Sequence, residues 1–143
     1  MITQKLKMKN DILKTVVSVE EIDNVCKRLG AQISEDYKDK KPVVIGLLKG
    51  CLPFMSDLLK YITTYVTLDY MSVSSYNGGT SSTGAITIKR DIESNVEGKD
   101  IIIVDDIIDT AITLTNIVEH FKKKINEFIV LGGHTANIWY VEK

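Results

Sequence analysis

The 143-residue sequence has few of the features that mark secreted, membrane-spanning or disulfide-stabilised proteins. Its two cysteines, Cys26 and Cys51, are too far apart in the sequence to form a CxxC metal or redox pair. No segment approaches the ~18 consecutive apolar residues that a membrane-spanning helix needs, and the first residues lack the apolar core of a signal peptide. We therefore expect a cytoplasmic protein with two free thiols.

An excess of charge is also missing, because 18 Lys and Arg residues face 19 Asp and Glu residues. This balance gives no reason to expect a nucleic acid or a membrane surface as a partner. A phosphorylated ligand remains compatible with it, since a nest of backbone amides binds phosphate without a basic surface. A length of 143 residues with 44% hydrophobic residues predicts one soluble domain spanning residues 1–143.

Three common functional motifs are absent. The sequence has neither the Gly-x-x-x-x-Gly-Lys-Ser/Thr phosphate loop nor the Gly-x-Gly-x-x-Gly dinucleotide motif. His120 and His134 have no cysteine or histidine partner at zinc-binding spacing, so we expect both side chains at the surface.

Hydrophobic periodicity predicts an α/β fold with a central parallel β-sheet flanked by helices. Ser18 and Glu21 have the spacing of a capping box, which marks the start of the first clear helix. Ligands bind at the carboxyl ends of the strands in such sheets. We expect helices at 18–37, 53–62 and 112–123, and strands at 43–48, 65–73, 85–90, 101–104 and 128–131.

The most informative segment is 101–113, where an apolar strand delivers three carboxylates and two hydroxyls to one edge of the sheet. Asp105 and Asp106 suit sugar hydroxyls, or Mg²⁺ held through water. Asp109 is a candidate general base. The amides of 109–113 open a helix, where the dipole favours a phosphate monoester. The alternative is that the aspartates only end a strand and cap a helix.

Two further segments are candidates for the same site. Lys49 and Gly50 follow a buried strand and suit phosphate or pyrophosphate, although a simple turn with a solvated lysine is the favoured explanation when this segment is taken alone. The polar segment 74–84 is long enough to be a lid that excludes water, with Tyr76 and its neighbouring serines touching the substrate. A disordered surface loop is the alternative for this segment.

Together these segments resemble the hypoxanthine-guanine phosphoribosyltransferases over about residues 15–124. The matching parts are 43–50 with Pro53 and Phe54, 74–76, and the phosphoribosyl-pyrophosphate signature at 103–114. The resemblance implies a type I phosphoribosyltransferase fold, which is Rossmann-like. It also implies a Mg²⁺-dependent enzyme of purine salvage that transfers 5-phosphoribose from 5-phosphoribosyl 1-diphosphate to hypoxanthine or guanine. It suggests a homodimer or homotetramer.

The resemblance also assigns roles to individual residues. It places Lys49 and Gly50 on the pyrophosphate loop, with an unusual cis peptide bond at Leu48–Lys49. Asp105 and Asp106 fall on the acidic pair that serves the ribose hydroxyls and the metal. Asp109 falls on the base near purine N7, and Ile107 on the residue that packs against the purine. Ser75 and Tyr76 fall on a mobile loop that shields the reaction. The loop that binds the 5-phosphate is formed by Asp109, Thr110, Ala111, Ile112 and Thr113.

The sequence departs from the family pattern at three places. Asp105 replaces the usual Glu, and Ala111 replaces a usual Gly, which would matter if that position needed positive φ. In 125–143 we match neither the purine-reading lysine nor the stacking aromatic, nor the further acidic metal contact, so the C-terminal part of the hood is expected to be missing or altered. The expected tail packs on the core or on a second subunit, although Trp139 or Tyr140 stacking on a base is an alternative.

These departures leave two functional hypotheses. One is a purine phosphoribosyltransferase that keeps donor-phosphate binding and has low or no transfer activity. The other is a non-catalytic regulatory module that binds phosphoribosyl pyrophosphate or a nucleotide. Preference among hypoxanthine, guanine and xanthine stays open, because the discriminating residues fall in the segment that we cannot match.

Overall fold

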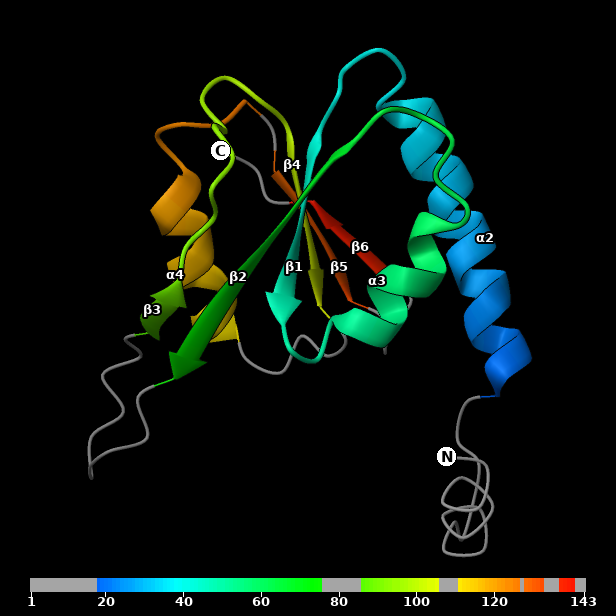
Figure 1. The fold of residues 1–143 in the computed structure, drawn as a ribbon, viewed down its shortest axis with the longest axis horizontal. Helices are drawn as coiled ribbons and strands as arrows, with labels where there is room; N and C mark the ends of the chain where they lie inside the picture. Colours follow the sequence, from blue (N-terminus) through cyan, green and yellow to red (C-terminus); the bar gives the residue numbers. More distant parts are fainter. Residues whose placement is uncertain (1–17, 76–85, 106–110, 127, 133–136, 141–143) are drawn as a thin grey trace, which may run out of the picture.

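The computed structural model describes residues 18–75, 86–105, 111–126, 128–132 and 137–140. Within these ranges the chain forms one six-stranded sheet with strand order β3-β2-β1-β4-β5-β6 (Figure 1). In chain order the elements are α2 (Val19–Asp36), β1 (Val43–Leu48), α3 (Leu52–Leu59), β2 (Thr67–Ser75), β3 (Ile86–Arg90), β4 (Ile101–Asp105), α4 (Ala111–Phe121), β5 (Phe128–Gly132) and β6 (Asn137–Tyr140).

The centre of the sheet is parallel and its two outer strands are antiparallel. β1 pairs in parallel with both β2 and β4, and β4 pairs in parallel with β5, which confirms the predicted parallel sheet. β3 and β6 run antiparallel to β2 and β5. Only four residues separate β5 from β6, too few for the crossover that a parallel pair requires, so this pair is a hairpin. The sequence patterns did not predict β6.

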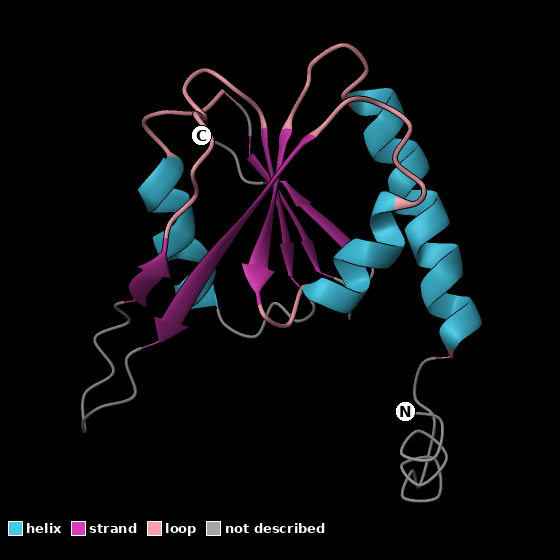
Figure 2. Cartoon of the chain, viewed as in Figure 1, coloured by secondary structure: helices cyan, strands magenta, loops and turns pink. Residues whose placement is uncertain are grey.

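The helices cover both faces of the sheet, with α2 and α3 on one face and α4 on the other (Figure 2). The predicted capping box is present at the start of α2. The Glu21 amide donates to Ser18 Oγ at 3.1 Å, and the Ser18 amide donates to the Glu21 carboxylate at 2.6 Å. α3 ends three residues before its predicted end, and residues 60–62 continue as a tight turn.

The core consists of two apolar clusters separated by the sheet. Val44, Ile102 and Val104 face α2 and α3, whereas Ile45 and Ile103 face α4. All five side chains are fully buried. The central strands are therefore covered on both faces, which explains why their sequences are continuous apolar runs without alternation.

Asp69 is a buried carboxylate near the start of β2. It accepts hydrogen bonds from the amides of Tyr70 at 2.7 Å, Glu93 at 2.9 Å and Ser94 at 2.7 Å. Burial raises the pKa of this carboxyl, but the hydrogen bonds from the Ser94 side chain and from the three amides outweigh burial and hold its pKa below the ordinary value. Asp69 thus anchors the segment that connects β3 to β4.

We predict that Asp69→Ala lowers the free energy of unfolding by about 2–3 kcal/mol at pH 7, because three amides lose their buried acceptor. The folded-state pKa of Asp69 lies below its unfolded-state value, so this contribution is complete above about pH 5 and declines as the pH falls through the lowered pKa. Urea unfolding at several pH values measures both effects. Asp57→Ala, which removes an exposed carboxylate paired with Lys60, is the control and should cost under about 1 kcal/mol. Equal losses in the two variants would contradict the prediction.

Candidate active site

The carboxyl ends of four strands meet at one edge of the sheet. Gly46 of β1 is aligned with Tyr70 of β2 and with Val104 of β4, and Val104 is aligned with Leu131 of β5. The strands continue from this row towards the lower edge in Figure 1. Lys49 and Asp105 therefore leave neighbouring strands, which in a sheet lie about 4.8 Å apart, at the same edge.

The turn after β1 presents Lys49 and Gly50 to solvent. Its base is made by two backbone hydrogen bonds, from the Cys51 amide to the Leu47 carbonyl and from the Leu52 amide to the Lys49 carbonyl, both at 3.2 Å. The Leu48–Lys49 peptide bond is cis, as the resemblance implied. α3 starts directly after this turn, so the connection between the strand and the helix is only three residues long.

Asp105 is the last residue of β4 and is half-buried, whereas the four residues before it are fully buried. Its position at the strand end is the predicted one. Asp106, Ile107, Asp109 and Thr110 lie outside the described residues, and the structure does not test their assigned roles.

α4 begins at Ala111, one residue before the predicted start, so the backbone of Ala111, Ile112 and Thr113 forms its first turn. A helical backbone has negative φ. Alanine in place of the usual glycine therefore carries no positive-φ cost at this position.

The predicted lid is described only at its start. β2 extends to Ser75, two residues beyond the predicted end, and the backbone of Ser75 is aligned with Ile86 of β3. Tyr76 and the rest of the polar segment lie outside the described residues.

The residues at this edge have donor chemistry that fits Mg²⁺. In the described part of the chain, no three His, Cys, Asp or Glu side chains form a metal cluster. Mg²⁺ typically takes one or two protein carboxylates and completes its shell with water and substrate phosphate. The half-buried carboxylate of Asp105, followed in sequence by that of Asp106, matches this requirement.

Two further expectations from the sequence concerned the cysteines and the histidines. Cys26 and Cys51 are buried free thiols, as predicted. His120 is only partly exposed, because its Nε2 lies 3.1 Å from a carboxylate oxygen of Asp91 and its ring packs edge-on against Phe121. It therefore lies at the surface, as predicted, where it bridges α4 and the residue that follows β3. His134 lies outside the described residues.

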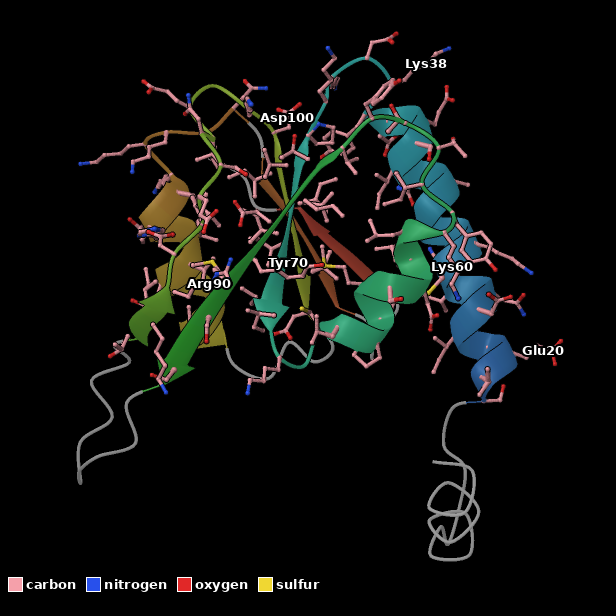
Figure 3. The ribbon with its side chains drawn as sticks, viewed as in Figure 1. Glu20, Lys38, Lys60, Tyr70, Arg90 and Asp100 are labelled. Carbon is pink, nitrogen blue, oxygen red and sulfur yellow. The ribbon has the colours of Figure 1, made fainter. Side chains whose placement is uncertain are left out.

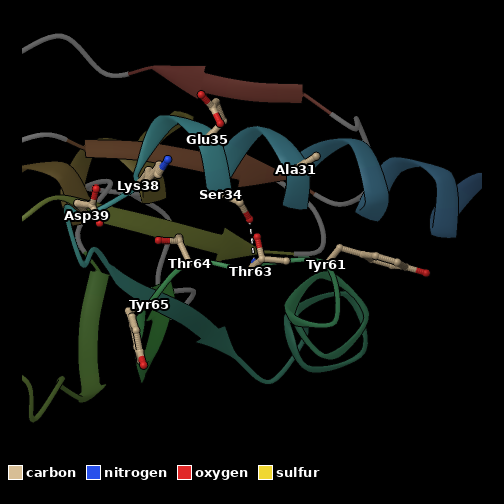
Figure 4. Close-up of a pocket in the computed structure, with 9 residues that line it drawn as sticks. All are labelled: Ala31, Ser34, Glu35, Lys38, Asp39, Tyr61, Thr63, Thr64 and Tyr65. Carbon is tan, nitrogen blue, oxygen red and sulfur yellow. Dashed lines mark hydrogen bonds between the residues drawn. The ribbon is translucent and has the colours of Figure 1, made fainter.

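A pocket of about 590 Å³ lies at the opposite edge of the sheet, where the amino ends of the parallel strands are. Its floor contains Ser34 and Thr63, whose amide donates to Ser34 Oγ at 2.8 Å (Figure 4). Lys38, which lines this pocket, lies with Asp100 at the amino end of the strands (Figure 3). The pocket is therefore separate from the edge that carries Lys49 and Asp105.

The described part of the chain contains no helix that is long and apolar enough to cross a membrane.

Comparisons with known proteins agree with this geometry. Residues 18–129 match the family model described as phosphoribosyl transferase domain. The chain is 47% identical over 117 residues to a hypoxanthine-guanine phosphoribosyltransferase of Streptococcus pneumoniae strain R6, covering 82% of this chain and 65% of the relative. It is 50% identical over 115 residues to the enzyme of the same name from Bacillus subtilis strain 168, covering 80% of this chain and 64% of the relative.

The structural comparison gives the same family. A crystal structure of a hypoxanthine phosphoribosyltransferase from Staphylococcus aureus aligns with a TM-score of 0.78 and 44% identity, covering 87% of this chain and 69% of that one. The structure of the Leishmania donovani enzyme aligns with a TM-score of 0.72 at 28% identity. The chain thus spans about two thirds of the length of the relatives that it matches.

Proposed function

The chain belongs to the phosphoribosyl transferase domain family, and from this premise we propose that it transfers 5-phosphoribose from 5-phosphoribosyl 1-diphosphate to hypoxanthine or guanine. The products are IMP or GMP and pyrophosphate. The observation that carries the proposal is the placement of the exposed Lys49–Gly50 turn and of Asp105 on adjacent strand ends. The names of the relatives at 45–50% identity support the purine as acceptor.

The reaction makes three demands on the site. The departing diphosphate must be stabilised, the ribose must be held while positive charge develops at its anomeric carbon, and water must be excluded because it would hydrolyse the donor. In our proposal, Lys49 and the Gly50 amide bind the diphosphate. Asp105 and Asp106 accept hydrogen bonds from the ribose hydroxyls.

Mg²⁺, when bound by Asp105 and Asp106, would neutralise charge on the diphosphate. The remaining assignments follow the family signature residue by residue. Asp109 is the general base near purine N7, and Ile107 packs against the purine. The amides and hydroxyls of 109–113 hold the 5-phosphate, and Ser75 with Tyr76 shields the reacting centre. We also propose a cytoplasmic homodimer or homotetramer whose other partners are small molecules.

We predict that Lys49→Met weakens binding of 5-phosphoribosyl 1-diphosphate at least tenfold, or about 1.4 kcal/mol, because the diphosphate loses a cationic partner. Isothermal titration calorimetry with Mg²⁺ present measures this affinity. Lys60→Met is the matched control, since Lys60 is an exposed lysine at the far end of α3 that pairs with Asp57. Equal affinities of the Lys49 variant and the wild type would contradict the assignment of the diphosphate to this turn.

We predict that Asp109→Asn lowers the rate of IMP formation 10²- to 10⁴-fold while leaving donor affinity within twofold, because only proton transfer is lost. Absorbance changes on mixing the chain with hypoxanthine, donor and Mg²⁺ measure the rate. Equal rates of IMP formation in Asp109→Asn and in the wild type would contradict the role of Asp109 as the base.

A further inference from the structure

Gly46 lies three residues before Lys49, at a point where β1 has no space for a side chain. A Cβ atom built on Gly46 would lie 2.6 Å from Met55 Sδ, 2.8 Å from Cys51 Sγ and 3.1 Å from Tyr70 Cδ1. Carbon atoms in proteins do not approach other heavy atoms this closely without displacing them. A side chain at position 46 would therefore displace the side chains of Met55 and Cys51, which pack directly against the strand.

Cys51 connects this close packing to the turn, because it contacts Gly46 and also belongs to the turn that carries Lys49 and Gly50. Its side chain is fully buried, with Sγ against Gly46. Its amide donates to the Leu47 carbonyl at 3.2 Å, and its carbonyl accepts from the Met55 amide at 2.8 Å. One residue therefore closes the turn that carries Lys49 and Gly50, starts the helix and packs on the strand.

We propose that Gly46 is a positioning residue for diphosphate binding, because its missing side chain lets Cys51 seat against β1 and thereby fixes the Lys49 and Gly50 backbone at the edge of the sheet. This inference rests on the proposed function. Its physical basis is that displacing binding groups by about 1 Å costs as much as 10²-fold in activity. A role confined to core packing would instead lower stability without a selective effect on the ligand.

The decisive comparison is between Gly46→Ala and Gly30→Ala. Gly30 is enclosed even more tightly, because its Cβ would lie 2.5 Å from Tyr61 Cβ and 2.7 Å from the Tyr61 carbonyl oxygen, which belongs to the backbone. It lies on α2, packed against the turn that follows α3, away from the Lys49 turn. Calorimetry with inorganic pyrophosphate and Mg²⁺ should show at least tenfold weaker binding for Gly46→Ala and a change within twofold for Gly30→Ala. Equal affinities of a folded Gly46→Ala variant and the wild type would overturn the proposal, as would equal losses in both variants.

A second pair of variants serves if Gly46→Ala does not fold. Cys51→Ala removes Sγ from the contact with Gly46 without crowding the strand, and Cys26→Ala removes the other fully buried thiol of the same core cluster from α2. We expect pyrophosphate binding to weaken at least threefold for Cys51→Ala and to stay within twofold for Cys26→Ala. Equal effects of the two thiol variants would overturn the proposal. In the double variant Gly46→Ala/Cys51→Ala the contact of the added methyl group with Sγ is relieved while its contact with Met55 Sδ remains, so binding should be tighter than in Gly46→Ala but weaker than in the wild type.

Backbone amide chemical shifts separate this inference from the proposed function, because they need no ligand. In Gly46→Ala the amide signals of Lys49 and Gly50 should move, and in Cys51→Ala the amide signal of Lys49 should move, whereas Gly30→Ala and Cys26→Ala should leave these signals in place. A wild-type chain that bound no pyrophosphate would refute the proposed function. The amide shifts would still decide whether Gly46 and Cys51 position the turn, and unmoved signals would refute that claim alone.

Discussion

The parallel pairing of β1 with β4 is the constraint on which the other features of the structure depend. Both strands are buried on both faces, so their apolar side chains contribute to the cluster under α2 and α3 and to the cluster under α4 at the same time. Each fully buried aliphatic side chain contributes roughly 1.5–3 kcal/mol relative to exposure. The same pairing brings the end of β4, with Asp105, beside the end of β1, from which Lys49 follows.

Hydrophobic burial alone does not choose the register of this pair, because a strand that is apolar on both faces stays apolar after slipping by one residue. Polar contacts at the amino ends of the strands help to select the register. The Val43 amide donates to the Asp100 carbonyl at 3.0 Å, directly before β4. The buried Asp100 carboxylate accepts from the Asn126 side-chain amide at 2.6 Å, shortly before β5. A buried carboxylate that lost this partner would pay a desolvation cost, so this contact penalises slipped registers of β4 against β5.

The sequence made the central elements predictable because each carries a local signal. The capping box of Ser18 and Glu21 marks the start of α2, and the apolar runs at 43–48 and 101–104 mark strands buried on both faces. β6 could not be predicted, since its strand character depends on pairing with β5 rather than on its own pattern. The anchoring role of Asp69 was hidden for a similar reason. Its partners Glu93 and Ser94 lie more than twenty residues further along the chain.

The candidate site was predictable to the same extent as its supporting strands. Lys49 and Asp105 lie at the same edge of the sheet, as the predicted strand ends indicated, because the carboxyl ends of parallel strands meet at one edge. The role of Gly46 was not visible in the sequence. A glycine inside an apolar run is compatible with many packings, and only the positions of Met55, Cys51 and Tyr70 show that a side chain is excluded there.

The two edges of the sheet are held by different kinds of contact, and this difference bears on function. At the amino edge, the carboxylate of Asp100 is used for structure, since it is buried against Asn126. At the carboxyl edge, the turn after β1 is held by backbone hydrogen bonds and by the buried Cys51 side chain. Lys49 is exposed on this turn. A turn fixed from below by uncharged groups leaves its cation available for an anionic ligand, which is what a diphosphate-binding turn requires.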